Sequence, residues 1–329
     1  MRKNFGVRFL RRVQRKIFKP KILKKIITVG NRQPRIRVTA SSPADNQVLV
    51  LKKIHRLEDL TTEISMFWEA NAAQWFSPEH RILIKINLNT ADPYPASTSP
   101  QMLSWLLDFL HDRGIRRVIV GDCSSLSALP TRKAARRAGL LAAINGRAEL
   151  LYFDETPWVT VPVSGRYLDR ITVPQITQDV DRIIALANLK THHLATFSAG
   201  LKLGVGFMHP MERYNLHRDH LNEKIAEISL AVPPDLTIID GRRAMISGGP
   251  AVGQVEKAGI VIIGTNPMLV DAEACRQLHA LKIEHGCLEN FPAEPFAQGQ
   301  LAHGHAIGLG DPARKHPECP NLQETGEKS

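Results

Sequence analysis

The chain has 329 residues, 43% of them hydrophobic, which is enough for two ordinary domains or one large α/β unit with a sizeable core. Its net charge of +11 is uneven, because residues 1–44 contain 14 Lys or Arg and no Asp or Glu, whereas the remainder carries 29 basic and 32 acidic residues. The folded body therefore lacks the basic face of a nucleic-acid-binding fold, and only the N-terminal segment could supply one.

Residues 1–44 form a basic N-terminal arm. Phe9, Val13 and Ile17 follow one another at intervals of four residues, which predicts a helix over residues 5–18 with one apolar stripe on a cationic surface. This pattern is typical of a helix that lies in an anionic membrane surface. A solvated tail, or one that docks on a protein partner through residues 1–38, is at least as good an alternative, and an RNA-binding arm comes third because no aromatic stacking platform accompanies it.

The arm carries neither a transmembrane segment nor a secretory signal. No apolar run approaches the roughly 20 residues that span a bilayer, and no apolar region precedes a small-residue cleavage site. The four cysteines are too scattered for a disulfide framework, so we expect a cytoplasmic protein that is either free or membrane-peripheral. Since no two cysteines form a C-x-x-C pair, the chain has no ferredoxin-type cluster motif, and the cofactor stays open between a metal and an organic molecule.

Strand and helix patterns alternate along residues 45–285, and this predicts one α/β domain. The expected fold is a mostly parallel sheet with helices on both faces, plus a small β-hairpin insertion. Residues 286–329 are rich in Gly, Pro and His and are expected to form an irregular C-terminal tail. Strands are predicted over 48–52, 81–88, 117–120, 149–153, 181–187, 236–239 and 259–263, helices over 57–76, 101–113, 131–144, 216–230 and 267–281, and the hairpin over 158–163 and 167–173.

A polar segment, NLKTHHLATFSAGLK over residues 188–202, follows the apolar strand predicted over 181–187. Ligand sites of α/β proteins lie just beyond the carboxyl ends of buried strands. Lysine supplies a cation with three donors, neutral imidazole supplies a base or metal ligand, and small residues admit a bound group close to the backbone. We therefore expect a small anionic ligand here, with His192 and Lys202 as catalytic residues and Lys190 as a binding residue. A solvated turn before a helix is the alternative.

Other strand ends carry further polar residues, and their loops would converge at the same edge of a parallel sheet. Asp122 and Asp240 could equally be helix caps or turn formers, and Gly248-Gly249 could be only a turn. No Walker A or G-x-G-x-x-G sequence accompanies them. The candidate ligand-binding residues are Asn87, Thr98, Asp122, Asn188, Lys190, Asp240, Gly248, Gly249 and Asp271.

His217 and His220 are the candidate metal ligands. Their spacing of three residues places both on one face of the helix predicted over 216–230. Two solvated surface histidines are the alternative.

Several ordered motifs between about Arg81 and Leu281 resemble the uncharacterised family known as domain of unknown function 362. That family is often associated with iron–sulfur centres, but this chain lacks the appended ferredoxin cysteines, and Leu203 stands where an Asn commonly follows the motif lysine. The motifs are Asp181-x6-Asn188-Leu-Lys-Thr-His192, Gly200-Leu-Lys202, Leu236-Thr-Ile-Ile-Asp240-Gly, Gly248-Gly249-Pro250, Gly264-Thr-Asn-Pro267 and Val270-Asp271-Ala272.

The sequence His192-x9-Lys202, with Phe197-Ser198-Ala199-Gly200 between, is more distantly similar to the nickel-pincer lactate racemase family. That resemblance implies that His192 transfers a proton, that Lys202 holds the pincer cofactor, and that His217 or His220 approaches the metal. The implied reaction abstracts and returns a hydride at the carbon of a 2-hydroxy acid. The loop Gly121–Ser124 departs from the family pattern because it lacks the second acid/base group.

Two classes of function follow from the sequence, and whether the protein is an enzyme stays open. In the first, the strand-end loops bind a small anionic ligand or cofactor and carry out redox or isomerase-type chemistry. In the second, a non-catalytic membrane-peripheral or assembly protein acts through its basic N-terminal arm.

Overall fold

A computed structural model describes Leu23 and residues 26–37 and 46–311. Its main sheet contains nine strands, and the five at its centre and one side, β10, β8, β3, β4 and β5, run parallel. β12 and β2 complete the other side: β12 pairs antiparallel with β10, and β2 pairs antiparallel with β12. The short strands β9 and β11 pair antiparallel with the last residues of β8 and β10. In spatial order the main strands are β2 (Val48–Leu51), β12 (Ile260–Gly264), β10 (Leu236–Met245), β8 (Arg182–His192), β3 (Ile82–Lys85), β4 (Val118–Asp122) and β5 (Glu149–Tyr152), with β9 at Thr196–Ser198 and β11 at Val255–Glu256.

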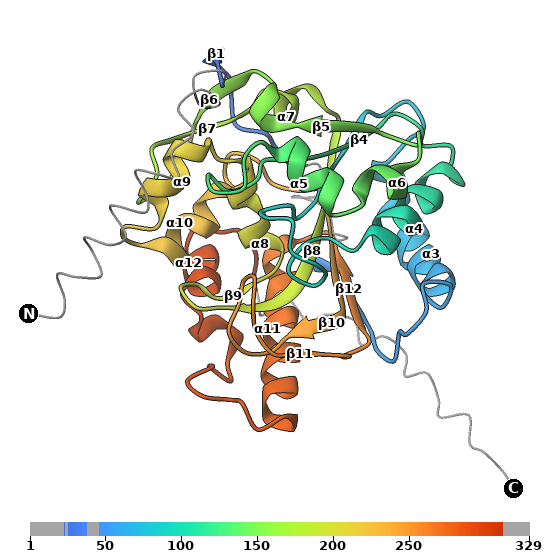
Figure 1. Cartoon of the computed structure of the whole chain (residues 1–329). Helices are drawn as coiled ribbons and strands as arrows, with labels where there is room; N and C mark the ends of the chain where they lie inside the picture. The colour runs from blue at the N-terminus through green and yellow to red at the C-terminus, as the bar shows by residue number, and fades with distance from the viewer. Residues whose placement is uncertain (1–22, 24–25, 38–45, 312–329) are drawn as a thin grey trace, which may run out of the picture.

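The two faces of this sheet are covered by separate hydrophobic cores. Along β8, Ile184 and Leu186 belong to one core and Ile183 and Ala185 to the other, as the two-residue repeat of a strand requires. Figure 1 shows one set of helices on the right of the sheet and the other at the lower left. The first core is closed by α3 (Leu60–Asn71), α4 (Pro100–His111), α5 (Thr131–Arg137) and α6 (Leu140–Ile144), and the second by α8 (Gly200–Leu203), α10 (Leu221–Ile228), α11 (Pro267–Glu284) and α12 (Gly299–Ala306).

A second, three-stranded sheet lies against the second core and contains the predicted hairpin, β6 (Trp158–Pro162) with β7 (Arg170–Pro174). The predicted fold class, a mostly parallel α/β sheet with helices on both faces and a small hairpin, is confirmed. None of the helices in the described ranges combines the length and the apolar character that crossing a bilayer requires. The remaining short elements are α7 (Ile176–Asp179), α9 (Pro210–Leu216) and the single turns η2 (Ala73–Trp75), η3 (Phe153–Glu155), η4 (Gly204–Phe207) and η5 (Pro295–Ala297).

Part of the basic arm belongs to the folded body. β1 (Thr28–Asn31) pairs in parallel with β6, and Ile26 is buried in the second core. The Arg35 guanidinium donates to the carbonyl of Val180 at 2.7 Å and pairs with the buried Asp235 carboxylate at 2.8 Å. Residues 26–37 of the predicted arm thus pack against the folded body, whereas the helix predicted over residues 5–18 lies outside the described residues.

Two predicted helices are broken, and a helix stands where none was expected. The helix predicted over 131–144 divides at Gly139, which has a left-handed φ of 72°. The helix predicted over 216–230 is also wrong at its start, because α9 ends at Leu216 and α10 begins at Leu221 after His220 with a φ of 45°. Within the tail expected to be irregular, α12 forms because Leu301 is fully buried against the second core.

Candidate functional site

The polar segment that follows Ala187 continues β8 and is not a loop. β8 runs to His192, and the chain then reverses to form β9, so that Lys190 lies opposite Ser198 and His192 opposite Thr196. Alternate residues of a strand share a face, and Asn188, Lys190 and His192 all line one cavity. Residues 188–192 were expected to lie beyond the end of the strand, and this prediction was wrong. Pairing with β9 satisfies the backbone hydrogen bonds of residues 190–192 and extends the sheet.

The cavity has a volume of about 410 Å³ and lies at the carboxyl ends of β3, β4 and β8. It brings together seven of the residues singled out in the sequence, although they come from separate segments of the chain. They are Asn87, Asp122, Asn188, Lys190, His192, Lys202 and His217. The loops after β3 and β4 thus converge on the β8–β9 hairpin as the parallel order of the strands predicts.

Two lysines of the cavity, the buried Lys190 and the half-buried Lys202, have no carboxylate partner among the described residues. The Lys190 ammonium donates to the carbonyls of Ala96 at 2.6 Å and Pro250 at 3.3 Å, and burial together with the nearby Lys202 lowers its pKa to about 7. Burial and the charge of Arg213 lower the pKa of Lys202 to about 8. Within the described part of the chain, the Lys202 ammonium has neither a hydrogen-bond acceptor nor an ion-pair partner. It is the cation best placed to meet a ligand.

A third lysine, Lys85, neutralises the cavity's carboxylate. Its ammonium lies 2.7 Å from Asp122, and both side chains are almost completely buried. The same carboxylate accepts hydrogen bonds from the backbone N–H groups of Leu88 and Cys123. Its charge is thus balanced by Lys85, and both of its oxygens already have hydrogen-bond donors. Lys85 was missed in the sequence because RILIKINL resembles a half-exposed strand, whereas β3 is a central strand that is buried on both faces.

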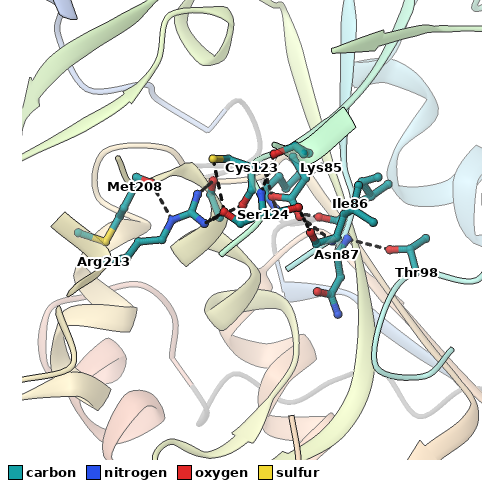
Figure 2. Close-up of polar contacts among 12 residues, drawn as sticks. Lys85, Ile86, Asn87, Thr98, Cys123, Ser124, Met208 and Arg213 are labelled. Carbon is teal, nitrogen blue, oxygen red and sulfur yellow. Dashed lines mark hydrogen bonds and ion pairs between the residues drawn. The ribbon is translucent and has the colours of Figure 1, made fainter. Parts of the chain in front are cut away.

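Arg213 was also missed, and it holds one wall of the cavity together. Its guanidinium donates to the carbonyls of Met208, Cys123 and Gly206 at 2.6–2.8 Å, and to that of Ser124 at 3.2 Å (Figure 2). These carbonyls satisfy its donors but do not neutralise its charge. Arg213 lies on α9, whose start at Pro210 after the capping residue His209 was the sequence signal that could have revealed this helix.

The hydrogen bonds of three histidines fix which ring nitrogen carries the proton. Nδ1 of His192 accepts from the backbone N–H groups of Leu194 and Ala195 at 3.1 and 3.2 Å, so the neutral ring carries its hydrogen on Nε2. Burial and the neighbouring Lys202 lower the pKa of His192 far below its ordinary value, which keeps the ring neutral. His192 therefore has an Nε2–H group that can donate a hydrogen bond.

His193 and His217 have the opposite arrangement. Nδ1 of His193 donates to the carbonyl of Gly249 at 2.8 Å, and Nδ1 of His217 donates to the carbonyl of Arg213 at 2.7 Å. Both rings consequently present the lone pair of Nε2, and both line the cavity. Burial lowers the pKa of His217, which favours the neutral form that acts as a base or a metal ligand.

The candidate metal pair is not brought together. His217 lines the cavity, but His220 does not, and its ring stacks on Tyr167 at a centroid distance of 4.2 Å. The break between α9 and α10 separates the two side chains that one continuous helix would have placed on the same face. Across the described ranges, no group of three or more His, Cys, Asp or Glu side chains is arranged to hold a metal ion.

Three of the remaining candidates position the binding residues but do not line the cavity. Thr98 exchanges hydrogen bonds with the backbone of Asn87, whose amide then bonds to the Asn188 side chain at 2.9 Å (Figure 2 shows the Asn87–Thr98 contact). Asp271 accepts from the backbone N–H groups of Gly200 and Leu201 at 2.6 and 2.9 Å. It thus fixes the first turn of α8, which carries Lys202. Gly249 supplies the carbonyl that orients His193.

Asp240 and Gly248 are engaged elsewhere. The Asp240 carboxylate pairs with Arg242 at 2.8 Å and accepts from the Tyr94 hydroxyl at 2.7 Å, so it belongs to a separate polar cluster. Gly248 and Gly249 both have left-handed φ angles, 72° and 81°, which the loop needs in order to approach β8 closely. β12 runs antiparallel to β10, and its last residue, Gly264, pairs with Thr237 near the start of β10. The loop that follows β12 therefore lies at the other end of the sheet.

Residues 82–276 match the family model of the domain of unknown function DUF362, which covers more than half of the chain. The chain belongs to this family. The family resemblance predicted from the sequence motifs is therefore confirmed, although membership assigns no activity.

Two similar proteins extend this comparison. The Thylakoid-associated protein sll1697 of Synechocystis sp. is 25% identical over 208 residues, which cover 59% of this chain and 61% of the relative. The lactate racemase apoprotein from Thermoanaerobacterium thermosaccharolyticum is a distant structural match, with a TM-score of 0.31 and 12% identity over 70% of this chain and 55% of that one. The chain thus spans less than two thirds of the length of either protein.

Proposed function

We propose that this DUF362 protein binds a small organic anion, either a substrate or a cofactor, in the cavity beside β8. The observation that carries the proposal is the excess of positive charge at the cavity: the buried Lys190 and Arg213 and the half-buried Lys202 line it, and the carboxylate that lines it, Asp122, is already paired with Lys85. Burying a charge without an opposite charge costs several kcal/mol. A bound anion would remove much of this cost, and the lowered pKa values of both lysines record it.

The histidines support acid/base chemistry on the bound anion. His192 offers an Nε2–H donor, while His193 and His217 offer unprotonated Nε2 atoms that can accept a proton. A donor and two acceptors around a cationic site suit proton transfer at a carbon next to the anionic group, which is isomerase-type chemistry. Redox chemistry at that carbon would in addition need an organic cofactor that accepts the electrons. In this proposal Lys190 and Lys202 hold the anionic group, and Asn87 and Asn188 supply neutral hydrogen bonds.

The test compares Lys202→Met with wild type. We expect the variant to fold normally, since the ammonium has no partner to lose among the described residues, and to bind acetate and inorganic phosphate at least tenfold more weakly (about 1.4 kcal/mol). Lys133→Met removes the same charge from an exposed position on α5, outside the cavity, and is the matched control. Equal anion affinity in Lys202→Met and Lys133→Met, measured by calorimetric titration, would remove the basis of the proposal.

The identity of the natural ligand requires a separate experiment. Native mass spectrometry with metal analysis, on protein purified without oxygen, distinguishes a bound organic molecule, a metal and an empty cavity. We expect an organic anion in wild type that is lost from Lys202→Met and retained in Lys133→Met.

As a second candidate function, we propose that residues 1–22 attach the protein to an anionic membrane surface. These residues contain nine Lys or Arg and no acidic residue, and the Synechocystis relative is named a thylakoid-associated protein. Each basic residue close to an anionic leaflet contributes about 1 kcal/mol. Deleting residues 1–22 should abolish co-sedimentation with vesicles rich in phosphatidylglycerol, while residues 26–37 stay to stabilise the body. Undiminished co-sedimentation of the truncated protein would contradict this function.

A further inference from the structure

The cavity beside β8 has two chemically different zones. Its charged zone contains the buried Lys190 and the half-buried Lys202. Its other zone is built from carbon, with the side chains of Leu126, Leu194, Leu203, Val205, Pro210, Tyr214 and Pro250. An inorganic anion needs only the first zone, so the second zone needs its own explanation.

Two of these apolar residues are exposed where the cavity opens. Leu194 lies in the turn between β8 and β9 and is 54% exposed, and Tyr214 lies on α9 and is 43% exposed. Met211, three residues before Tyr214 on the same helix face, is 37% exposed and continues the apolar surface outward. Large apolar side chains left in water around a cavity mark a binding surface for apolar groups.

We infer that the ligand is an amphiphilic anion, whose carboxylate or phosphate meets Lys190 and Lys202 and whose hydrocarbon or aromatic part lies against Leu194 and Tyr214. This inference rests on the proposed anion-binding function and names its ligand class. The volume agrees, since about 410 Å³ lies within the range of about 300–1,000 Å³ that accommodates organic ligands and exceeds what an inorganic anion requires. Because Lys190 is 4% exposed whereas Leu194 and Tyr214 are 54% and 43% exposed, the anionic group would enter first.

The test is a series of straight-chain carboxylates from acetate to octanoate, with the matching alkyl phosphates as a second series to show which anionic group is preferred. A methylene that leaves water for an apolar wall contributes about 0.8 kcal/mol, which is about fourfold in Kd. We expect affinity to rise two- to fourfold per methylene, measured by calorimetry below the concentration at which the probes form micelles. The uncharged 1-octanol should bind at least tenfold more weakly than octanoate.

Substitutions in the two zones should have different effects. Leu194→Ser should reduce the gain per methylene, whereas Lys202→Met should weaken every member of the series by the same factor. Leu141→Ser is the matched control, because Leu141 is 46% exposed on α6 and does not line the cavity. Tyr214→Ser is a second variant on the opposite element of the opening.

The outcomes separate this inference from the function on which it rests. Anions that bind in a Lys202-dependent manner without any gain per methylene would overturn the amphiphilic ligand and retain the anion site. A gain per methylene that survives in both Leu194→Ser and Tyr214→Ser would also overturn it, because the apolar part would then lie elsewhere. Binding that is independent of Lys202 would overturn the proposed function itself.

Discussion

Anion binding by the cavity should weaken steeply between pH 6 and pH 9. Burial lowers the pKa of Lys190 to about 7 and that of Lys202 to about 8, so both carry charge at pH 6 and lose it as the pH rises. An anion binds the charged forms of the two lysines and raises both of their pKa values. The affinity for the anion is therefore highest at a pH below the pKa values that Lys190 and Lys202 have before it binds. His192 stays neutral throughout, because its pKa is already far below this range.

The size of the effect follows from the two pKa values. Between pH 6 and pH 9 the charged fraction of Lys190 falls from about 90% to about 1%, and that of Lys202 from about 99% to about 10%. The affinity should therefore fall about 100-fold if only Lys190 matters, about 10-fold if only Lys202 matters, and about 1,000-fold if both charges are required.

The assay is calorimetric titration with butanesulfonate, which stays ionised across this range, in buffers of different ionisation enthalpy that reveal proton uptake on binding. In Lys202→Met the tenfold decrease in affinity that is due to the titration of Lys202 should be absent. The remaining decrease should occur at higher pH, because the charge of Lys202 lowers the pKa of Lys190. Lys133→Met should reproduce the wild-type profile. An affinity that is constant from pH 6 to pH 9, or that rises with pH, would refute the reasoning.

Three further predictions concern the framework of the site. Lys85→Met should lower the free energy of unfolding by about 3–5 kcal/mol in urea titrations, because it leaves the Asp122 carboxylate buried without a counter-charge, and adding Asp122→Asn should recover part of the loss. Gly200→Ala should destabilise the fold by about 1–3 kcal/mol and weaken anion binding, since the added methyl group would lie 2.7 Å from the Thr237 side chain beneath α8; unchanged binding would contradict the positioning role of this turn. Deleting residues 1–37 should lower the Tm by several degrees in thermal melts relative to the protein that lacks only residues 1–22, through loss of β1 and the Arg35 ion pair.

The general architecture could be predicted from the sequence because local patterns encode it. Apolar runs of strand length alternate with helical periodicities, and this alternation was enough to predict a mostly parallel sheet covered on both faces. The direction of β12 could not be predicted, because α11 follows β12 in sequence as a helix follows a parallel strand, while the strand itself runs antiparallel to β10. Breaks at Gly139 and His220 depend on left-handed residues that a helical pattern conceals.

The centre of the site was predicted from a local cluster, and its surroundings were not. Lys190, His192 and Lys202 are close in sequence and line the same cavity. The partnership of Lys85 with Asp122 depends on the register of β3 against β4, and the contacts of Arg213 depend on the packing of α9 against the distant loop after β4 and against η4. Such contacts arise only when the chain folds, so the residue types alone did not predict them.

The β8–β9 hairpin restricts how the spacing between His192 and Lys202 can change. Inserting or deleting one residue in the turn would shift β9 against β8 and reverse which side chains face the cavity from one of the two strands. It would also rotate α8, whose first residue follows β9 after a single intervening position. The number of residues between His192 and Lys202, nine, is therefore constrained by the geometry of the hairpin. Relatives with the same cavity should differ in length in other loops.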